Sequence, residues 1–335
     1  MSFVVELLPR GLRFTVEADE TVLAAAVRQG YTFPHSCSNG VCGVCKGRLV
    51  SGRVHYQGVG LYGLTEDEIA SGHALFCTAR PETDLQIEVE DVLAPGEFPI
   101  KTIVCQIAML EPVSADTWRV RLRPPVFDRP RFRAGQYLFL LGPQGERRAF
   151  SIASAPEDSE YVELHIRATP GHDAALAVIE QLRSGPVARI EIAHGQCTVR
   201  PGERPLLFIA GGTGFAPFKA MLESMQARGE TRPVHLYWGA RSLDHLYLRE
   251  LPLRWARDVP NFRYTEVLSE PDPAWSGRQG LVHEAALADH PDVSGLDVYA
   301  SGRPEMVFAA YDAFKARGLP ADRFYSDMLD LRAAI

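Results

Sequence analysis

Short apolar runs separated by turn residues occupy the first ninety positions of the chain. Residues 21–29 carry an amphipathic helical pattern that ends at Gly30, a residue favoured directly after a helix. Thr65-Glu66-Asp67-Glu68 has the sequence of a capping box and predicts a second, short helix. Alternating or continuous apolar positions predict strands over residues 3–7, 12–16, 45–50 and 85–89. This order of elements predicts a small β-grasp domain over residues 1–93.

Two prolines and a glycine interrupt the pattern over residues 94–100, which we interpret as a linker. Residues 101–203 then show mostly period-two patterns with dense turn signals, and they predict a small antiparallel β-barrel. One helix is expected within it, over residues 174–183. The predicted strands cover residues 118–122, 137–141, 150–153 and 161–167.

From residue 204 the rhythm changes to strands alternating with helices. Such alternation predicts a parallel, doubly wound α/β sheet over residues 204–335. The predicted strands cover residues 206–210, 234–238, 263–268 and 297–300, and the predicted helices cover 215–228, 243–257 and 304–317.

The composition narrows the class of protein. With 335 residues, 46% of them hydrophobic, the chain can form two or three folded domains and is not disordered. A net charge of −7 argues against a general nucleic-acid binder, which needs a basic face. No apolar run reaches the ~18 residues of a membrane span, and the N-terminal residues lack the pattern of a signal peptide. We therefore expect a cytoplasmic protein without a membrane segment.

The strongest chemical signal is a group of four cysteines, Cys37, Cys42, Cys45 and Cys77. The first three are spaced C-x4-C-x2-C, and the fourth lies 32 positions after Cys45. This is the spacing of plant-type [2Fe–2S] ferredoxins, in which four thiolates hold two irons. A structural zinc site is the alternative, although zinc ligands usually come as two C-x2-C pairs. A thioredoxin-like dithiol would leave Cys37 and Cys77 without a role.

Two further segments carry a resemblance to the ferredoxin–NADP reductase superfamily. Residues 133–137 (RAGQY) match a strand that usually precedes the flavin segment, and residues 147–151 (RRAFS) match its R-x-Y-S stretch. The resemblance implies that Arg148 binds the FAD diphosphate and that Ser151 contacts the flavin N5. It also places Ala149 in the same segment and packs Phe150, where the family has tyrosine, against the flavin ring.

A second flavin element is only partly present. His165-Ile166-Arg167 matches the family's His-x-Arg, and Gly171 stands where a glycine pair with a following hydroxyl is usual. No hydroxyl follows here, and Asp173 is expected to cap the next helix instead. By resemblance, His165, Arg167 and Gly171 belong to the FAD site.

A glycine turn follows the apolar strand over residues 206–210. Such a turn lets the backbone approach a pyrophosphate, and the helix after it offers free N–H groups and a positive dipole end. The sequence is the G-G-T-G-x-A-P form typical of the same superfamily. The nucleotide-binding residues are therefore expected to be Gly211, Gly212, Thr213, Gly214 and Pro217.

A third match lies at Ser301-Gly302-Arg303-Pro304, which resembles the superfamily's C-G-x-P motif. The resemblance places Ser301 and Gly302 beside the nicotinamide, with Ser301 and Ser151 as the residues closest to the reaction. Arg241 follows the strand where the adenosine ribose is expected, and one arginine there leaves the choice between NADH and NADPH open. The resembling enzymes mostly use NADH, which we therefore expect.

The resemblance covers almost the whole chain and implies an NADH reductase with FAD and a 2Fe–2S cluster. Electrons would pass from NADH through FAD and the cluster to an acceptor protein, most simply a Rieske-type or diiron oxygenase. An alternative acceptor is a dehydrase of 3,6-dideoxysugar synthesis, as for the CDP-6-deoxy-Δ3,4-glucoseen reductases. A more distant alternative is a zinc-stabilised binding protein without redox activity. We expect a monomer that binds neither nucleic acid nor membrane. Residues 1–93 carry 12 acidic and 7 basic side chains, net −5, so this part holds most of the negative charge.

Overall fold

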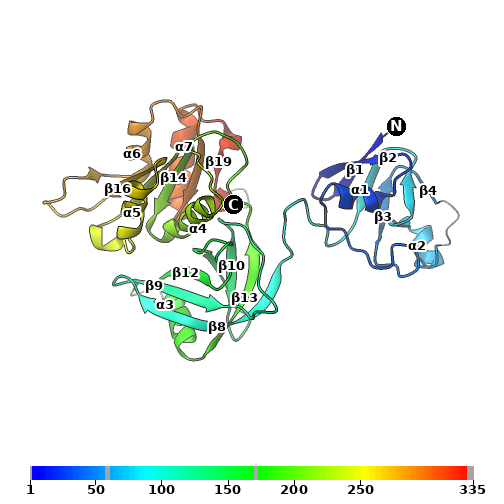
Figure 1. The fold of residues 1–335 in the computed structure, drawn as a ribbon, viewed down its shortest axis with the longest axis horizontal. Coiled ribbons are helices and arrows are strands. Elements are labelled where there is room, and N and C mark those ends of the chain that lie inside the picture. The colour runs from blue at the N-terminus through cyan, green and yellow to red at the C-terminus, as the bar shows by residue number, and fades with distance from the viewer. Residues whose placement is uncertain (1, 57–60, 170–172, 330–335) are drawn as a thin grey trace. The chain divides into compact units, whose positions relative to one another are not determined.

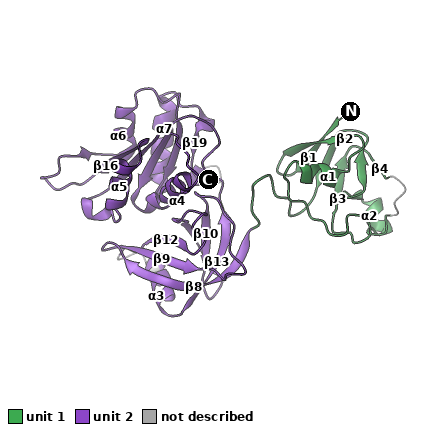
Figure 2. Ribbon diagram, viewed as in Figure 1, with its two compact units in different colours: residues 1–99 green, residues 100–335 purple. Residues whose placement is uncertain are grey.

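The computed structural model describes residues 2–56, 61–169 and 173–329 (Figure 1). Gly171, one of the predicted FAD residues, lies outside these described ranges. The chain divides into two compact units, residues 1–99 and 100–335 (Figure 2). Within the described ranges, no helix is both long enough and apolar enough to cross a bilayer.

Unit 1 is built on a five-stranded mixed sheet in the order β2-β1-β7-β3-β5. β1 pairs with β2 as an antiparallel hairpin and with β7 in parallel, which is the β-grasp arrangement. Helix α1 packs on the sheet, and a two-stranded ribbon of β4 and β6 lies beside it. The strands are β1 (Ser2–Leu8), β2 (Leu12–Glu17), β3 (Lys46–Ser51), β4 (Val54–Tyr56), β5 (His73–Leu75), β6 (Ala79–Pro81) and β7 (Leu85–Glu88), and the helices are α1 (Val22–Arg28) and α2 (Glu66–Ala70).

The helix boundaries of unit 1 follow local chemistry. At the end of α1, Gly30 donates its N–H to Val27 and Tyr31 donates to Ala26, which is a Schellman motif around a residue with φ of +84°. At the start of α2, Thr65 and Glu68 exchange side-chain and backbone hydrogen bonds, so the predicted capping box is present.

The first half of unit 2 is a six-stranded antiparallel sheet in the order β11-β10-β13-β8-β9-β12. A bridge between Ile152 and Leu164 joins the two ends of this order, so the sheet closes into a barrel. Its interior is apolar and includes Leu138, Leu164 and Ile190. The elements are β8 (Lys101–Pro112), β9 (Thr117–Arg123), β10 (Tyr137–Leu141), β11 (Arg147–Ser151), β12 (Val162–Arg167), α3 (Asp173–Arg183) and β13 (Val187–His194).

The second half of unit 2 is a parallel sheet in the order β17-β16-β15-β14-β18-β19. Residues of β14 alternate between two cores: Phe208 faces the side of α4 and α5, and Ile209 faces the side of α6 and α7. The sheet is therefore doubly wound, as predicted. Its elements are β14 (Leu206–Gly211), α4 (Phe215–Ala227), β15 (Val234–Ala240), α5 (Glu250–Asp258), β16 (Phe262–Leu268), β17 (Arg278–Gln279), α6 (Val282–Asp289), β18 (Asp297–Ser301), α7 (Pro304–Ala316) and β19 (Phe324–Tyr325).

One predicted helix begins later than the sequence pattern suggested. The helix expected over residues 243–257 is a 3₁₀ turn over Leu243–His245 followed by α5 from Glu250. Pro252 explains the difference, because proline lacks an N–H and is tolerated in the first turn of a helix but not in its interior. The strand expected over residues 150–153 is likewise shifted and runs from Arg147 to Ser151. The predicted boundary between residues 203 and 204 stays a prediction, and the two sheets of unit 2 lie on its two sides.

Candidate functional site

The four predicted cluster ligands lie in one region of unit 1. Cys37 and Cys42 are exposed on the loop before β3, whereas Cys45 and Cys77 are buried against the core of the unit. The backbone N–H of Cys42 donates to the sulfur of Cys37, and Cys45 lies close enough to Cys77 and Cys42 for these groups, in addition to burial, to raise its pKa. Within the described residues, no group of three or more Cys, His, Asp or Glu side chains lies in an arrangement that could hold a metal ion as the side chains stand. The donor set, three thiols on one loop and a fourth in the turn between β5 and β6, still fits the chemistry of a 2Fe–2S cluster.

The loop around Cys37 directs backbone N–H groups at its sulfur. Hydrogen bonds from the backbone of Asn39, Cys42 and Val41 lower the pKa of the Cys37 thiol to about 6, because they favour the thiolate. The N–H of Cys42 lies 3.4 Å from the Cys37 sulfur. Backbone N–H groups directed at the sulfur stabilise the negative charge of a thiolate ligand. Burial acts in the opposite direction on Cys45 and raises its pKa to about 12.

Close backbone packing gives the cysteine loop its shape. Gly43 has φ of +75°, and a Cβ at this position would lie 2.8 Å from the carbonyl oxygen of Gly63. Gly63 in turn donates its N–H to the carbonyl of Gly40 over 2.9 Å. The loop is therefore held against residues 61–64 by contacts that a larger side chain at Gly43 would prevent.

In unit 2, a cavity of about 660 Å³ lies between the barrel and the parallel sheet. On the sheet side it is lined by residues at the carboxyl ends of β14, β15, β16 and β18. The strand order reverses between β14 and β18, and ligands of doubly wound sheets bind at this point. On the barrel side it is lined by residues of β11 and β12.

Most of the predicted flavin and nicotinamide residues meet at this cavity. They come from five separate segments of the chain, which the fold brings to one place. Those that line the cavity are Ala149, Phe150, Ser151, His165, Arg167, Gly211, Gly212, Thr213, Gly214, Arg241, Ser301 and Gly302. Arg148 and Pro217 do not line it: Arg148 is exposed on β11, and Pro217 is buried in the first turn of α4.

The glycine turn after β14 packs directly on the segment that carries Ser301. β14 and β18 pair in parallel with Ala210 opposite Ser301. A Cβ on Gly214 would overlap the carbonyl of Ser301, so only glycine permits this approach. On the other side of the turn, the indole N–H of Trp238 donates to the carbonyl of Gly212 over 2.9 Å. The two nicotinamide motifs recognised in the sequence thus form one continuous surface.

Arg167 has unused hydrogen-bonding capacity at the cavity. Its Nε donates to Oδ2 of Asp116 over 2.6 Å, which fixes the guanidinium. Burial alone would raise the pKa of Asp116, but the hydrogen bond and charge of Arg167 outweigh it and lower that pKa. The Nη2 atom of Arg167 is buried and has no hydrogen-bond partner. A buried donor without an acceptor is unfavourable, and the phosphate oxygens of a dinucleotide would satisfy it.

His165 lies at the cavity, but its imidazole is occupied by protein contacts. Nδ1 lies 2.9 Å from the hydroxyl of Tyr247, and Nε2 lies 3.1 Å from Oε1 of Glu163. Burial lowers the pKa of His165, so the ring is neutral at physiological pH. With a neutral ring, Nε2 donates to the carboxylate and Nδ1 accepts from the tyrosine.

Several residues at the site were absent from the sequence prediction. Glu270 and Ser269 follow β16, and Gly239 and Ala240 end β15 beside Arg241. The backbone N–H of Glu270 donates to the carbonyl of Arg241 over 2.8 Å, so these two residues are neighbours. Their position at the carboxyl ends of predicted parallel strands was a signal that could have identified them.

Three family models match the chain in the order that the fold implies. A 2Fe-2S iron-sulfur cluster binding domain matches residues 5–82, an oxidoreductase FAD-binding domain matches residues 104–198, and an oxidoreductase NAD-binding domain matches residues 208–312. The fold and site therefore define an NAD(P)H-dependent oxidoreductase with FAD and a 2Fe–2S cluster, and the zinc-stabilised, non-redox alternative is not supported.

Relatives of similar length place the chain more closely. CDP-6-deoxy-L-threo-D-glycero-4-hexulose-3-dehydrase reductase of Yersinia pseudotuberculosis is 36% identical over 327 residues, which cover 98% of both chains. Phenol hydroxylase P5 protein of Acinetobacter pittii is 35% identical and covers 97% of this chain and 95% of its own. Among solved structures, the reductase GcoB of Amycolatopsis is 33% identical with a TM-score of 0.66, covering 96% of this chain and 97% of its own.

The chain belongs to the family of reductases that join a ferredoxin domain to FAD- and NAD-binding domains. Proteins of this kind pass electrons from NADH through FAD and a 2Fe–2S cluster to an acceptor protein, and this chain carries the parts for that transfer.

Proposed function

We propose that this chain is the reductase component of a multicomponent oxygenase. The observation that supports this most directly is the exposed cysteine loop of unit 1, carried on the same chain as the dinucleotide cavity of unit 2. A cavity for NADH and flavin alone would serve small acceptors. A surface-exposed one-electron centre suits delivery to another protein.

Different residues of the cavity would bind FAD and the nicotinamide nucleotide. Arg167 would bind the diphosphate of FAD through its unpaired Nη2. The turn at Gly211–Gly214, with the N-terminus of α4 behind it, would bind the pyrophosphate of the nicotinamide nucleotide. Ser151 and Ser301, both lining the cavity, would contact the reacting rings. FAD, when bound, supplies the change from two-electron to one-electron transfer.

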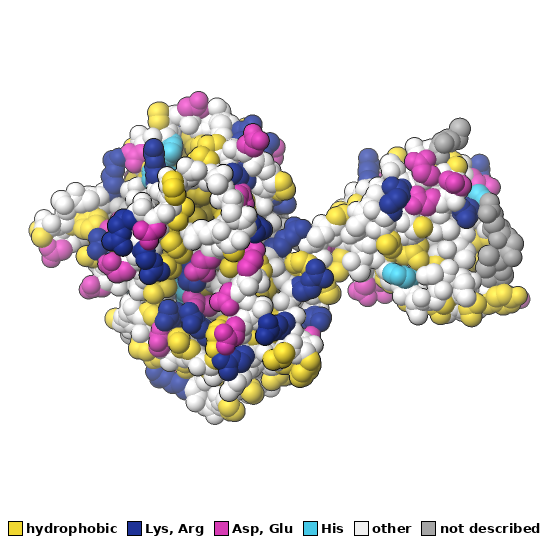
Figure 3. Space-filling model, viewed as in Figure 1, with side chains coloured by type: hydrophobic (Ala, Val, Ile, Leu, Met, Phe, Trp, Pro, Cys, Tyr) yellow, Lys and Arg dark blue, Asp and Glu magenta, His cyan; other side chains and the backbone are white. Residues whose placement is uncertain are grey.

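The surface around the cysteine loop has the character of a transient docking site. Val41 and Val44 are 56% and 48% exposed on the loop. Figure 3 shows acidic and basic side chains side by side on the visible face of unit 1, with hydrophobic atoms exposed among them, and residues 1–93 carry a net charge of −5. A small contact steered by charge permits the rapid release that electron transfer between proteins requires. An acceptor with a basic or mixed patch near its own redox centre would fit this surface.

A second acceptor class is favoured by one relative. The Yersinia protein, 36% identical over nearly the full length, is named as the reductase of a CDP-hexulose dehydrase. The phenol hydroxylase relative is 35% identical over a similar length and favours an oxygenase. A dehydrase of a nucleotide-linked sugar is therefore the alternative acceptor.

The test begins with the visible spectrum of the purified full-length protein. Flavin and [2Fe–2S] absorption, bleached together by NADH, are expected, and a colourless protein would contradict the proposal. NADH-driven electron delivery is then measured to a purified oxygenase component and to a purified sugar dehydrase. Turnover of the oxygenase substrate supports the first acceptor, and dehydrase turnover alone transfers the assignment to the second. A monomeric state remains a prediction that the same preparation can test. A cytoplasmic location also remains a prediction.

A further inference from the structure

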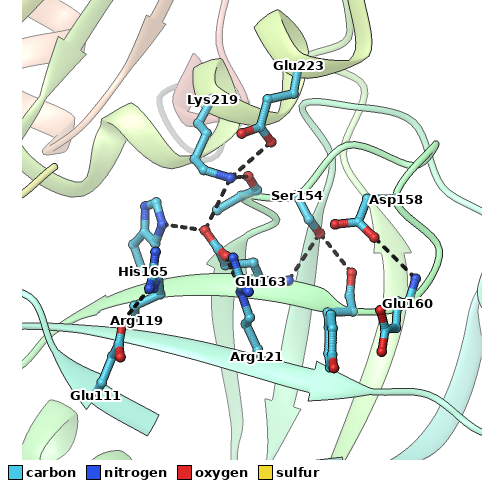
Figure 4. Close-up of polar contacts among 12 residues, drawn as sticks. Glu111, Arg119, Arg121, Ser154, Asp158, Glu160, Glu163, His165, Lys219 and Glu223 are labelled. Atoms are coloured by element: carbon cyan, nitrogen blue, oxygen red, sulfur yellow. Dashed lines mark hydrogen bonds and ion pairs between the residues drawn. The ribbon is translucent and has the colours of Figure 1, made fainter. Parts of the chain in front are cut away.

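A buried lysine crosses from the nucleotide-binding sheet to the barrel. Lys219 lies on α4, five residues after Gly214, and its side chain is directed at the barrel (Figure 4). Its ammonium group has three partners: it donates to the carbonyl of Ala153 at 3.0 Å and to Oε2 of Glu223 at 2.9 Å, and it forms an ion pair with Oε1 of Glu163 at 3.2 Å. Two of the three belong to the barrel. One hydrogen bond and one ion pair of the lysine thus fix α4 against the barrel.

The barrel presents a carboxylate prepared for this lysine. Glu163 on β12 is 2% exposed; its two oxygens accept hydrogen bonds from His165 and Arg121, and Lys219 forms an ion pair with it. Burial alone would raise the pKa of Glu163, but the hydrogen bond from His165 and the charge of Lys219 outweigh it and lower that pKa. The carboxylate is therefore ionised inside the protein, and each of its oxygens accepts a hydrogen bond.

Neighbouring contacts hold the same two parts together. His165, two residues along β12, contacts the hydroxyl of Tyr247 in the segment between β15 and α5. Its ring also stacks on Phe215 at the start of α4, with centroids 6.5 Å apart. Farther along α4, the hydroxyl of Ser224 donates to Glu157 over 2.9 Å. The start and the later turns of α4 are thus both tied to the barrel.

The lysine connects the two segments whose alignment the reaction requires. Ala153 lies two residues after Ser151, and Gly214 belongs to the turn that packs on Ser301. From this geometry we infer that Lys219 is a positioning residue for flavin reduction. Through Ala153 and Glu163 it sets the distance between the flavin-binding segment and the nicotinamide-binding turn. It touches neither cofactor site directly, because it is not among the residues lining the cavity.

Energetics favour a positioning role over a purely stabilising one. The cost of removing two charges from water offsets much of their attraction, so a buried ion pair contributes little net stability compared with apolar side chains of similar size. What the pair supplies is a fixed geometry with several hydrogen bonds. The rate of a reaction between two bound molecules depends on their relative position, since a misplacement of about 1 Å can lower the rate by ~10²-fold.

The test uses Lys219→Met in the full-length protein loaded with FAD and the cluster. The expected result is normal FAD content and an apparent Kd for NADH close to that of the unmodified protein. The limiting rate of flavin reduction in anaerobic stopped-flow should fall by ~10- to 100-fold. The long-wavelength charge-transfer absorbance of the NADH–flavin complex should weaken, because it reports ring stacking. Lys219→Arg, which keeps the charge and donors, should restore most of the rate.

Two further variants separate positioning from folding. Lys315→Met removes an exposed lysine of α7, distant from these contacts, and should behave as the unmodified protein. Lys219→Met combined with Glu163→Gln removes both charges and avoids an unbalanced carboxylate, and it should fold yet still reduce its flavin slowly. The inference would be overturned if flavin reduction stayed within about twofold of the normal rate in folded Lys219→Met or in the folded double variant with Glu163→Gln. So would failure of both to bind FAD, which would assign the lysine to folding.

A readout without bound cofactors completes the test. In the FAD-free full chain, hydrogen–deuterium exchange of residues 151–155 and of α4 should increase in Lys219→Met and remain normal in Lys315→Met. The inference rests on the proposed placement of FAD and NADH at the cavity. Flavin reduction in the unmodified protein tests that placement, and a protein that does not reduce its flavin would contradict the proposed function rather than the role of Lys219.

Discussion

Arg167 of the barrel lies beside Gly212 of the nucleotide-binding turn. The Nη1 atom of the arginine is 3.6 Å from the position that a Cβ on Gly212 would occupy. Arg167 ends β12 of the barrel and Gly212 begins the turn after β14 of the parallel sheet, and each was predicted from a different motif. Their proximity places a fixed cation, held by Asp116, next to the backbone turn that would receive a pyrophosphate.

Replacing Arg167 with methionine should weaken FAD binding. The change removes the buried Nη2 donor and the charge, and hydrogen bonds to charged groups contribute about 1.5–3 kcal/mol, or roughly 10- to 100-fold in Kd. The measurement is a fluorescence titration of the FAD-free protein with FAD. Arg189→Met, at an exposed position of β13, serves as the control and should bind FAD normally. Equal FAD affinity in both variants would remove Arg167 from the diphosphate site.

Replacing Gly214 with alanine should impair the reaction with NADH and leave electron transfer from the flavin to the cluster unchanged. The new methyl group would overlap the carbonyl of Ser301 and push the two nicotinamide motifs apart. We expect NADH-driven flavin reduction to fall by at least ~10-fold, and electron flow from chemically reduced flavin to the cluster to continue. Gly185→Ala is the matched control, because a Cβ at Gly185 would meet no atom within 4 Å. A normal rate in Gly214→Ala would show that the close approach is not required.

Features set by local spacing could be predicted from the sequence. The C-x4-C-x2-C loop, the capping box at Thr65 and the glycine turn at Gly211 depend on residues close together in the chain, and the structure has each where it was expected. β13 was not among the predicted strands. Its clear period-two pattern, with Ile190 and Ile192 inward, could have identified it. β8 was also not predicted, and its pattern is less clear. Val104 on its outer face is apolar and 49% exposed, which obscures the alternation of apolar and polar residues.

Features that depend on distant residues could not be predicted in this way. Lys219 and Ala153 are 66 positions apart, and nothing in either neighbourhood indicates that they meet. The same holds for His165, which the family resemblance assigned to the FAD site. Its imidazole is used by Glu163 and by Tyr247, whose position follows only from the packing of α4 and β15 on the barrel.

Replacing Cys42 with serine should separate the two redox functions of the chain. Loss of one thiolate ligand is expected to remove or destabilise the cluster, and cytochrome c reduction should fall by at least ~10-fold. Ferricyanide reduction driven by NADH should continue, since this small acceptor can take electrons from the flavin. Cys197→Ser, outside unit 1, is the control and should keep both activities. Intact cytochrome c reduction in Cys42→Ser would contradict the electron path through the ferredoxin domain.

Glu270 should favour NADH over NADPH. It lines the cavity beside Arg241 at the carboxyl ends of β15 and β16, where the adenosine ribose is expected. A carboxylate there would repel a 2′-phosphate, so kcat/KM should be higher for NADH. Glu270→Gln should raise kcat/KM for NADPH by about 2- to 5-fold, the range for one exposed charge interaction, and leave the NADH value nearly unchanged. A preference for NADPH in the unmodified protein would reverse the assignment.

Electron delivery to the acceptor should slow as salt is added. Residues 1–93 carry a net charge of −5, which would steer a basic patch of the acceptor toward the cysteine loop. Raising the ionic strength from 0.1 M to 1 M shortens the Debye length from ~10 Å to ~3 Å and screens this attraction. The measurement compares NADH-driven turnover of the acceptor with ferricyanide reduction over a salt series. Ferricyanide reduction does not use the docked acceptor and should change much less. Delivery that is constant or faster at high salt would instead point to the exposed side chains of Val41 and Val44 as the main contacts, and the Val41→Ser variant would then lose more delivery than any change of surface charge.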